Sequence, residues 1–231
     1  MKKVLLWVRI IRPQTLFASL VPVLVGLRVA NGMPSAAHHP LLAGILTAIC
    51  AVSLQVLANL INDYYDFVRG TDKAGRQGFK RALAEGEVST GQMKAACLTT
   101  LAITVSTGFY LVLVGGWIIL AIGLSAILFA WLYTATSHSL SYLGIADMFV
   151  FLYYGVIASA GTTYIITHAF STMSFLAGAV CGLISMCVLM TNNLRDIDSD
   201  REAGKKTLPV RFGKRAAQAV LLVEVLLMPV F

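Results

Sequence analysis

Charged residues are scarce in this sequence. Asp, Glu, Lys and Arg together make up only 13% of its 231 residues, whereas hydrophobic residues make up 58%, and the mean hydropathy is +0.78. Ordinary soluble domains carry about 25% charged residues and a smaller apolar share. The composition therefore excludes an ordinary soluble domain and predicts an integral membrane protein.

Cysteine and histidine are also rare, with four residues of each. The cysteines have no C-x-x-C spacing and lie in apolar runs, where we expect small buried side chains: Cys50, Cys97, Cys181 and Cys187. The histidines form no H-E-x-x-H pattern, so no zinc site is expected. The first apolar run lacks a small-residue cleavage site, and it is therefore predicted to remain as a membrane anchor.

The sequence is rich in long apolar runs. About 20 helical residues cross a hydrocarbon core of roughly 30 Å, and such runs lie near 14–31, 41–62, 95–114, 117–134, 145–167 and 172–193, with a seventh beginning near 216. The short VGGW connection requires its two helices to be antiparallel neighbours. The sequence thus predicts an all-α, polytopic transmembrane helix bundle. It is expected to form a single domain, 1–231, that is truncated at its C-terminus, within its seventh span or at the far edge of that span.

Positive charge is distributed very unevenly along the chain. Every Lys and Arg except Arg28 lies in the N-terminal segment, in 69–94 or in 195–215. Because positive charge near short loops stays on the cytoplasmic side, these segments are predicted to face the cytoplasm from a multi-pass protein of the plasma (inner) membrane. The formal net charge of +7 therefore indicates topology, and no nucleic-acid partner is expected.

Two acidic segments follow the second and the sixth apolar run. They are NDYYDFVRGTD at 62–72 and NNLRDIDSDREAGKKTL at 192–208. Residues four apart stack on one helix face, and each segment has such a set: Asn62 and Asp66 in the first, and Asn192, Asp196 and Asp200 in the second. Asp198 lies about 200° from that face, so it is predicted to be exposed.

Stacked carboxylates repel one another unless a cation lies between them. Mg²⁺ prefers oxygen ligands and commonly binds through one or two carboxylates together with substrate phosphates. The interleaved Lys and Arg side chains could hold the remaining phosphate oxygens. Each segment by itself is more typical of a solvated helix end with positive flanks, but the repeated pattern favours a shared site for a metal and a diphosphate.

These segments resemble the paired aspartate motifs of the UbiA superfamily of membrane aromatic prenyltransferases, N-x-x-x-D-x-x-x-D and D-x-x-x-D. NDYYDFVRGTD and NNLRDIDSDREAGKKTLPVRFG are most similar to the versions in the branch that prenylates 1,4-dihydroxy-2-naphthoate in menaquinone synthesis. RPQTL at 12–16, YT at 133–134 and YLGIAD at 142–147 support the resemblance. The chain departs from the general first motif at Gly70, where the third acid would stand, and has Asp72 instead. It also lacks the Arg-Pro that often follows the Tyr-Thr pair.

The resemblance implies a bundle of nine spans around a central cavity, of which this chain would supply about seven. It implies Mg²⁺ as the cofactor, with these ligands: Asn62, Asp66, Asp72, Asp196 and Asp200. Among these, the expected catalytic residues are Asp66, Asp196 and Asp200. The candidates for diphosphate contacts are Lys73, Arg76, Arg81, Arg195, Arg201 and Lys205. The candidates for contacts with the aromatic acceptor are Tyr133 and Asp147.

The expected activity is Mg²⁺-dependent transfer of a polyprenyl group from polyprenyl diphosphate to an aromatic acceptor within the lipid bilayer. The narrower resemblance favours 1,4-dihydroxy-2-naphthoate as acceptor, with loss of carbon dioxide and formation of demethylmenaquinone. Sister branches use 4-hydroxybenzoate, homogentisate or haem-type acceptors, and these remain alternatives. An ion-coupled transporter is the rival class, but it would place ionisable groups near the bilayer midplane, whereas these acids concentrate at the ends of apolar runs.

Overall fold

The regular structure in the chain is helical. The computed structural model describes residues 2–71, 81–135, 139–140 and 145–231, and no strand occurs in these ranges. The main helices are α1 (Lys2–Ile11), α2 (Pro13–Ala30), α3 (Pro40–Val68), α4 (Thr90–Leu132), α6 (Ala146–Phe151), α7 (Ile157–Thr167), α8 (Thr172–Arg195), α9 (Ile197–Glu202) and α10 (Leu208–Leu227). A π-helical turn, η1 (Leu152–Val156), joins α6 to α7, and a 3-10 turn, η2 (Met228–Val230), follows α10. The all-α prediction is confirmed.

Five helices in the described residues are long and apolar enough to cross a membrane: α2, α3, α4, the continuous α6–η1–α7 segment, and α8. Helix α4 has 43 residues and bends at Gly116, whose φ of 69° and ψ of −156° are not helical. Glycine adopts such a positive φ at little cost, so α4 contains both runs predicted at 95–114 and 117–134. The seventh predicted run lies in α10, which is not among the five and carries four charged residues.

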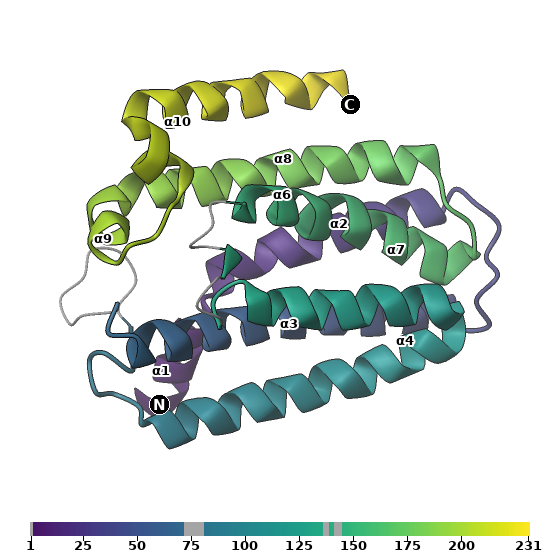
Figure 1. Cartoon of the computed structure of the whole chain (residues 1–231). Coiled ribbons are helices and arrows are strands. Elements are labelled where there is room, and N and C mark those ends of the chain that lie inside the picture. The colour runs from purple at the N-terminus through teal and green to yellow at the C-terminus, as the bar shows by residue number, and fades with distance from the viewer. Residues whose placement is uncertain (1, 72–80, 136–138, 141–144) are drawn as a thin grey trace.

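The helices lie side by side, and successive long helices run in opposite directions (Figure 1). Helix α8 approaches η1 through glycines: a Cβ atom at Gly155 would lie 2.4 Å from the carbonyl oxygen of Gly178. Small residues allow such close backbone contact between membrane helices. On its other side, α8 is accompanied along part of its length by α10 (Figure 1). Close packing at η1 thus fixes α8, whose C-terminal end carries the second acidic segment.

Both acidic segments lie at the same end of the bundle. The C-terminal ends of α3 and α8 meet there, together with α9 and the start of α2 (Figure 1). At the opposite end, the connection between α2 and α3 is tied to α7, because the backbone amides of Ala36 and Ala37 donate to the Ile166 carbonyl at 3.0 and 3.1 Å. The fold therefore brings together two segments that are more than a hundred residues apart in the sequence.

A short hydrophobic cluster anchors residues 81–89 to this end. Ala82, Leu83 and Val88 pack with Leu60 of α3 and Met93 of α4. Helix α4 then begins at a capping box, in which the Ser89 hydroxyl accepts from the Gln92 amide and the Gln92 side chain accepts from the Ser89 amide. This packing fixes the position of the neighbouring residue Arg81, which carries a candidate site side chain.

Candidate active site

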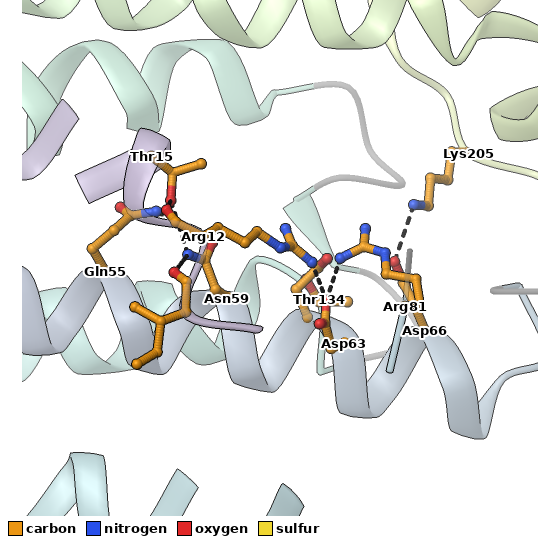
Figure 2. Close-up of polar contacts among 11 residues, drawn as sticks. Arg12, Thr15, Gln55, Asn59, Asp63, Asp66, Arg81, Thr134 and Lys205 are labelled. Atoms are coloured by element: carbon orange, nitrogen blue, oxygen red, sulfur yellow. Dashed lines mark hydrogen bonds and ion pairs between the residues drawn. The ribbon is translucent and has the colours of Figure 1, made fainter. Parts of the chain in front are cut away.

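The two acidic segments meet at a largely enclosed lysine, whose side chain is 11% exposed. Asp66 on α3 is 0% exposed and Asp200 on α9 is 5% exposed. Lys205 Nζ lies 3.3 Å from Asp66 Oδ2 and 3.7 Å from Asp200 Oδ1, as Figure 2 shows for the contact with Asp66. A cationic group thus lies between carboxylates from both segments, and Lys205 is positioned at the centre of the predicted site.

The second acidic segment is not one continuous helix, which corrects the expectation that it would be. Helix α8 ends at Arg195, and Asp196 has φ −95° and ψ 13°. The i to i−4 pattern nevertheless continues, because the Asp196 amide donates to the Asn192 carbonyl at 3.0 Å and the Asp200 amide to the Asp196 carbonyl at 2.8 Å. Asp200 is therefore still directed inward. Asp198, with 89% of its side chain exposed, is outside as predicted.

Three basic candidates are placed differently from one another. Arg195 lines the central cavity and donates to Asp196 Oδ1 at 2.8 Å. Arg81 also lines the cavity and forms an ion pair with Asp63. Arg201 is exposed and pairs with Asp198 at 3.3 Å, and it is not among the cavity-lining residues. The remaining candidates Asp72, Lys73 and Arg76 lie outside the described residues.

Asn62 occupies the cavity wall beside the acids. Its Nδ2 donates to Thr134 Oγ1 at 2.9 Å, which ties the end of α3 to the end of α4. Because Nδ2 is the donor, the amide oxygen of Asn62 remains an acceptor at the cavity. Asn62 therefore lies on the wall of the same cavity as Asp196 and Asp200, and its role as an oxygen ligand stays a prediction.

An ion cluster that the sequence did not predict, with a buried carboxylate at its centre, lies next to this site. Asp63 is 3% exposed and accepts hydrogen bonds from both Arg12 and Arg81 (Figure 2). Two features of the sequence could have indicated this cluster: Asp63 directly follows Asn62, and Arg12 is the first residue of RPQTL. Helical phase places Asp63 within about 60° of Asp66, and only the fold shows that two arginines meet Asp63 while a lysine meets Asp66.

One large cavity runs through the bundle from this end. Its volume is about 1130 Å³, and α2, α3, α4, α6–α7 and α8 all contribute to its wall. The polar lining at the acidic end comes from Arg12, Asn62, Arg81, Arg195, Asp196, Asp200 and Lys205. Farther along, the lining is apolar and includes Phe17, Val112, Leu120, Leu124, Ile127 and Val150. A cavity with a charged end and a long apolar body suits an amphiphile with an anionic head and a hydrocarbon tail.

Both acceptor candidates belong to this cavity. Tyr133 follows the end of α4, and Asp147 lies in the first turn of α6. Asp147 Oδ1 is buried and has no hydrogen-bond partner among the described residues. A buried carboxylate oxygen without a partner is costly, so Asp147 is suited to accept a hydrogen bond from a ligand.

The residues present fit a divalent cation such as Mg²⁺. Asp66 Oδ1 is fully buried and has no hydrogen-bond partner in the described part of the chain, and carboxylate and amide oxygens are the ligands that Mg²⁺ prefers. In the described ranges, no three His, Cys, Asp or Glu side chains are close enough to share an ion. Asp66, Asp200 and Asn62 are thus the described residues best placed to hold the metal, while Asp196 faces Arg195.

Comparisons with known proteins give one consistent result. A model of the UbiA prenyltransferase family matches residues 19–231. The chain is 37% identical over 216 residues to the 1,4-dihydroxy-2-naphthoate octaprenyltransferase of Escherichia coli K12, covering 90% of this chain and 68% of that protein. It is 34% identical over 207 residues to the protein of that name from Mycobacterium tuberculosis, covering 90% of this chain and 70% of that one.

Solved structures show the same fold. A UbiA homolog from Archaeoglobus fulgidus bound to GPP and Mg²⁺ superposes with a TM-score of 0.74 at 21% identity, covering 96% of this chain and 74% of that one. The structure of the homolog bound to DMAPP and Mg²⁺ gives a TM-score of 0.73. The arrangement of helices around the cavity is therefore shared with proteins of known structure.

Proposed function

Since this chain belongs to the UbiA prenyltransferase family, we propose that it transfers a polyprenyl group from polyprenyl diphosphate to 1,4-dihydroxy-2-naphthoate, with loss of carbon dioxide. The observation that carries the proposal is the buried acid Asp200 at the charged end of a long apolar cavity, with the buried acid Asp66 joined to that end through the cavity-lining Lys205. The names of the Escherichia coli and Mycobacterium tuberculosis relatives support the naphthoate acceptor.

The diphosphate is proposed to bind at the charged end, with the prenyl tail in the apolar part. Bound Mg²⁺ would neutralise charge on the leaving diphosphate, and the A. fulgidus structures with Mg²⁺ and prenyl diphosphates support this dependence. The proposed metal ligands are Asp66 and Asp200 together with Asn62 and Asp196. Lys205, Arg195 and Arg81 line the same end and would donate hydrogen bonds to phosphate oxygens, as cationic side chains do strongly.

The transfer then breaks one bond and forms another. The bond between prenyl C1 and the diphosphate oxygen breaks, and its electron pair leaves with the diphosphate. The electron-rich ring carbon that bears the carboxylate forms the new bond to C1, and the electron pair of its bond to the carboxylate returns to the ring as carbon dioxide departs, which makes the ring aromatic again. Asp147, with an unpartnered buried oxygen, is the proposed acceptor for a ring hydroxyl. Tyr133 is the proposed second contact on the acceptor.

The proposal places the protein in the plasma (inner) membrane. The end that contains Asp66, Asp200 and Lys205 would face the cytoplasm, because almost all Lys and Arg residues lie in the segments at this end. The buried acids at one end of the bundle do not favour the rival class, a transporter of ions.

The test uses the purified protein in lipid nanodiscs. We expect a prenyl diphosphate with Mg²⁺ to raise its melting temperature, and EDTA to abolish the shift and the transfer activity. A panel of aromatic acceptors should show turnover with 1,4-dihydroxy-2-naphthoate above 4-hydroxybenzoate and homogentisate. A rise in melting temperature that persists in EDTA would contradict the metal-dependent site. A preference for another acceptor would assign the protein to a sister branch of the family.

A further inference from the structure

The short helix α1 presents an apolar face that lies open. Val4 is 66% exposed, Leu5 64% and Val8 44%. The step of 100° per residue places these three side chains within about 100° of one another, on one side of the helix. Single exposed apolar residues are common, whereas an apolar face of this kind indicates a binding surface.

The opposite side of α1 holds the helix against the bundle. Ile10 is 4% exposed and belongs to a cluster with Leu60 of α3 and Met93 of α4. Leu6 and Trp7 pack against the same cluster. The open face therefore belongs to a helix whose position is fixed by packing.

A braced turn sets the direction of α1. Arg12, between α1 and α2, has φ 59° and ψ 69° in the left-handed region, which a residue with a Cβ atom adopts only when its surroundings enforce it. Asn59 Nδ2 of α3 donates to the Ile11 carbonyl at 3.1 Å and to Thr15 Oγ1 at 3.0 Å, and Thr15 Oγ1 donates to the Arg12 carbonyl at 2.9 Å. Helix α1 consequently does not continue α2 but runs across the long helices, at the end of the bundle that carries the acidic segments (Figure 1).

The residues packed with α1 indicate its depth in the membrane. Leu60 lies near the end of the apolar run 41–62, and Ala96 and Cys97, which pack against the same cluster, lie at the start of the run 95–114. Helix α1 is therefore at the level where α3 and α4 leave the hydrocarbon core. Its 10 residues make a helix about 15 Å long, which is too short to cross a core of roughly 30 Å but can lie in the plane of the interface.

The charged residues of α1 suit an anionic surface. Lys2 and Lys3 are exposed at its start, and Arg9 forms an ion pair with Glu87 at the surface. On the helical wheel, Lys2 and Arg9 border the open apolar face. An apolar face bordered by Lys and Arg is typical of helices that lie in the membrane interface, and anionic lipids attract cations close to the membrane surface.

We propose that α1 is an interfacial helix that binds anionic phospholipids at the end of the bundle that carries the acidic segments. Val4, Leu5 and Val8 enter the boundary of the acyl chains, while Lys2 and Lys3 contact lipid phosphates. Lipid is the proposed occupant, rather than a second copy of this chain, because α1 lies beside the ends of two spans and its cations match an anionic surface. The inference goes beyond the proposed function and does not depend on the transfer reaction.

The first experiment measures how deeply α1 lies in the bilayer. With the native cysteines replaced, Leu5→Cys carries a fluorescent label in nanodiscs that hold one copy of the protein each. We expect lipids with brominated acyl chains to quench this label strongly, and aqueous iodide to quench it several-fold less than a label at Glu202→Cys. Glu202 is the matched control because it is exposed at the same end of the bundle on the short helix α9.

The second experiment measures the preference of α1 for anionic lipid. Quenching of the Leu5→Cys label is compared between brominated phosphatidylglycerol and brominated phosphatidylcholine at equal mole fractions. We expect a preference for phosphatidylglycerol that falls roughly fivefold for each cation removed in Lys2→Gln with Lys3→Gln. The matched control, Lys214→Gln with Arg215→Gln, removes the same charge from exposed positions of α10 and should leave the preference unchanged.

Each result supports or overturns the proposal. Equal access of iodide to the labels at Leu5→Cys and Glu202→Cys would overturn the interfacial position of α1. Shielding that occurs only in nanodiscs with two copies would show that a second copy covers the face, and would overturn lipid as its occupant. Equal quenching by the two brominated lipids would overturn the anionic preference, and a preference that survives the double lysine substitution would overturn the role of Lys2 and Lys3. Melting temperatures measured in parallel establish that the variants are folded.

Discussion

Asp198 and Asp200 offer a sharp test, because they lie on the same short helix and can receive the same substitution. Asp200 is 5% exposed and its Oδ1 lies 3.7 Å from Lys205 Nζ. Asp198 has 89% of its side chain exposed and pairs only at the surface, with Arg201 at 3.3 Å. We expect Asp200→Asn to abolish most of the activity and Asp198→Asn to leave it almost unchanged.

The expected magnitudes follow from these positions. Asp200→Asn removes a charged oxygen from the end of the cavity where the diphosphate is proposed to bind, and it leaves Lys205 with one fewer carboxylate. Loss of one group that stabilises charge in a transition state lowers turnover roughly a hundredfold or more, which corresponds to about 2.7 kcal/mol. Asp198→Asn breaks only an exposed ion pair, worth about 0–1 kcal/mol, and should change turnover less than about twofold.

The assay is prenyl transfer to 1,4-dihydroxy-2-naphthoate by matched amounts of wild type and both variants, with melting temperatures measured in parallel. The comparison is valid only where both variants remain folded, and the melting temperatures establish this. Equal loss in both variants would refute the assignment of inward and outward faces on α9. Full activity of Asp200→Asn would refute the participation of the second acidic segment, whichever family the chain belongs to.

Two more predictions follow from the membrane topology and from the packing of α8. With the native cysteines replaced, Glu202→Cys should react only with reagents that reach the cytoplasm and His38→Cys only with external ones, and reversed labelling in intact cells would contradict the proposed orientation. Gly155→Val should destabilise the bundle by about 1–3 kcal/mol or more, because a Cβ atom there would lie 2.4 Å from the Gly178 carbonyl oxygen. Gly123→Ala, whose Cβ would meet nothing within 4 Å, is the control in a thermal unfolding series, and equal melting temperatures for the two variants would contradict the packing.

The fold class could be predicted because it follows from local properties of the chain. Apolar runs of about 20 residues define membrane helices through their length alone, and the structure confirms an all-α bundle. The boundary at 114–117 was also predictable as a tight connection, although the two helices merge into α4 through the bend at Gly116. The break of the second acidic segment at Asp196 could not be predicted, because i, i+4 spacing shows which residues share a helix face but does not show whether the helix continues.

Part of the candidate site could likewise be predicted from the sequence, and part could not. Asp66 and Asp200 were identifiable because repeated acids at helical spacing beside apolar runs are rare, and the outward direction of Asp198 followed from the 100° step of the helix. The cluster of Arg12, Asp63 and Arg81 was not identifiable, because its members come from three segments and each resembles an ordinary charged residue near a membrane surface.

By itself, the sequence indicated the membrane environment of this protein, the long apolar runs and the two acidic segments, since each depends on hydrophobicity and on spacing along the chain. Only the tertiary structure decided that Lys205 lies between Asp66 and Asp200, that Arg12 turns toward Asp63, and that one cavity connects the charged end to the apolar interior. Those features depend on contacts between helices distant in the sequence, and the packing of whole helices, rather than local preference, fixes such contacts.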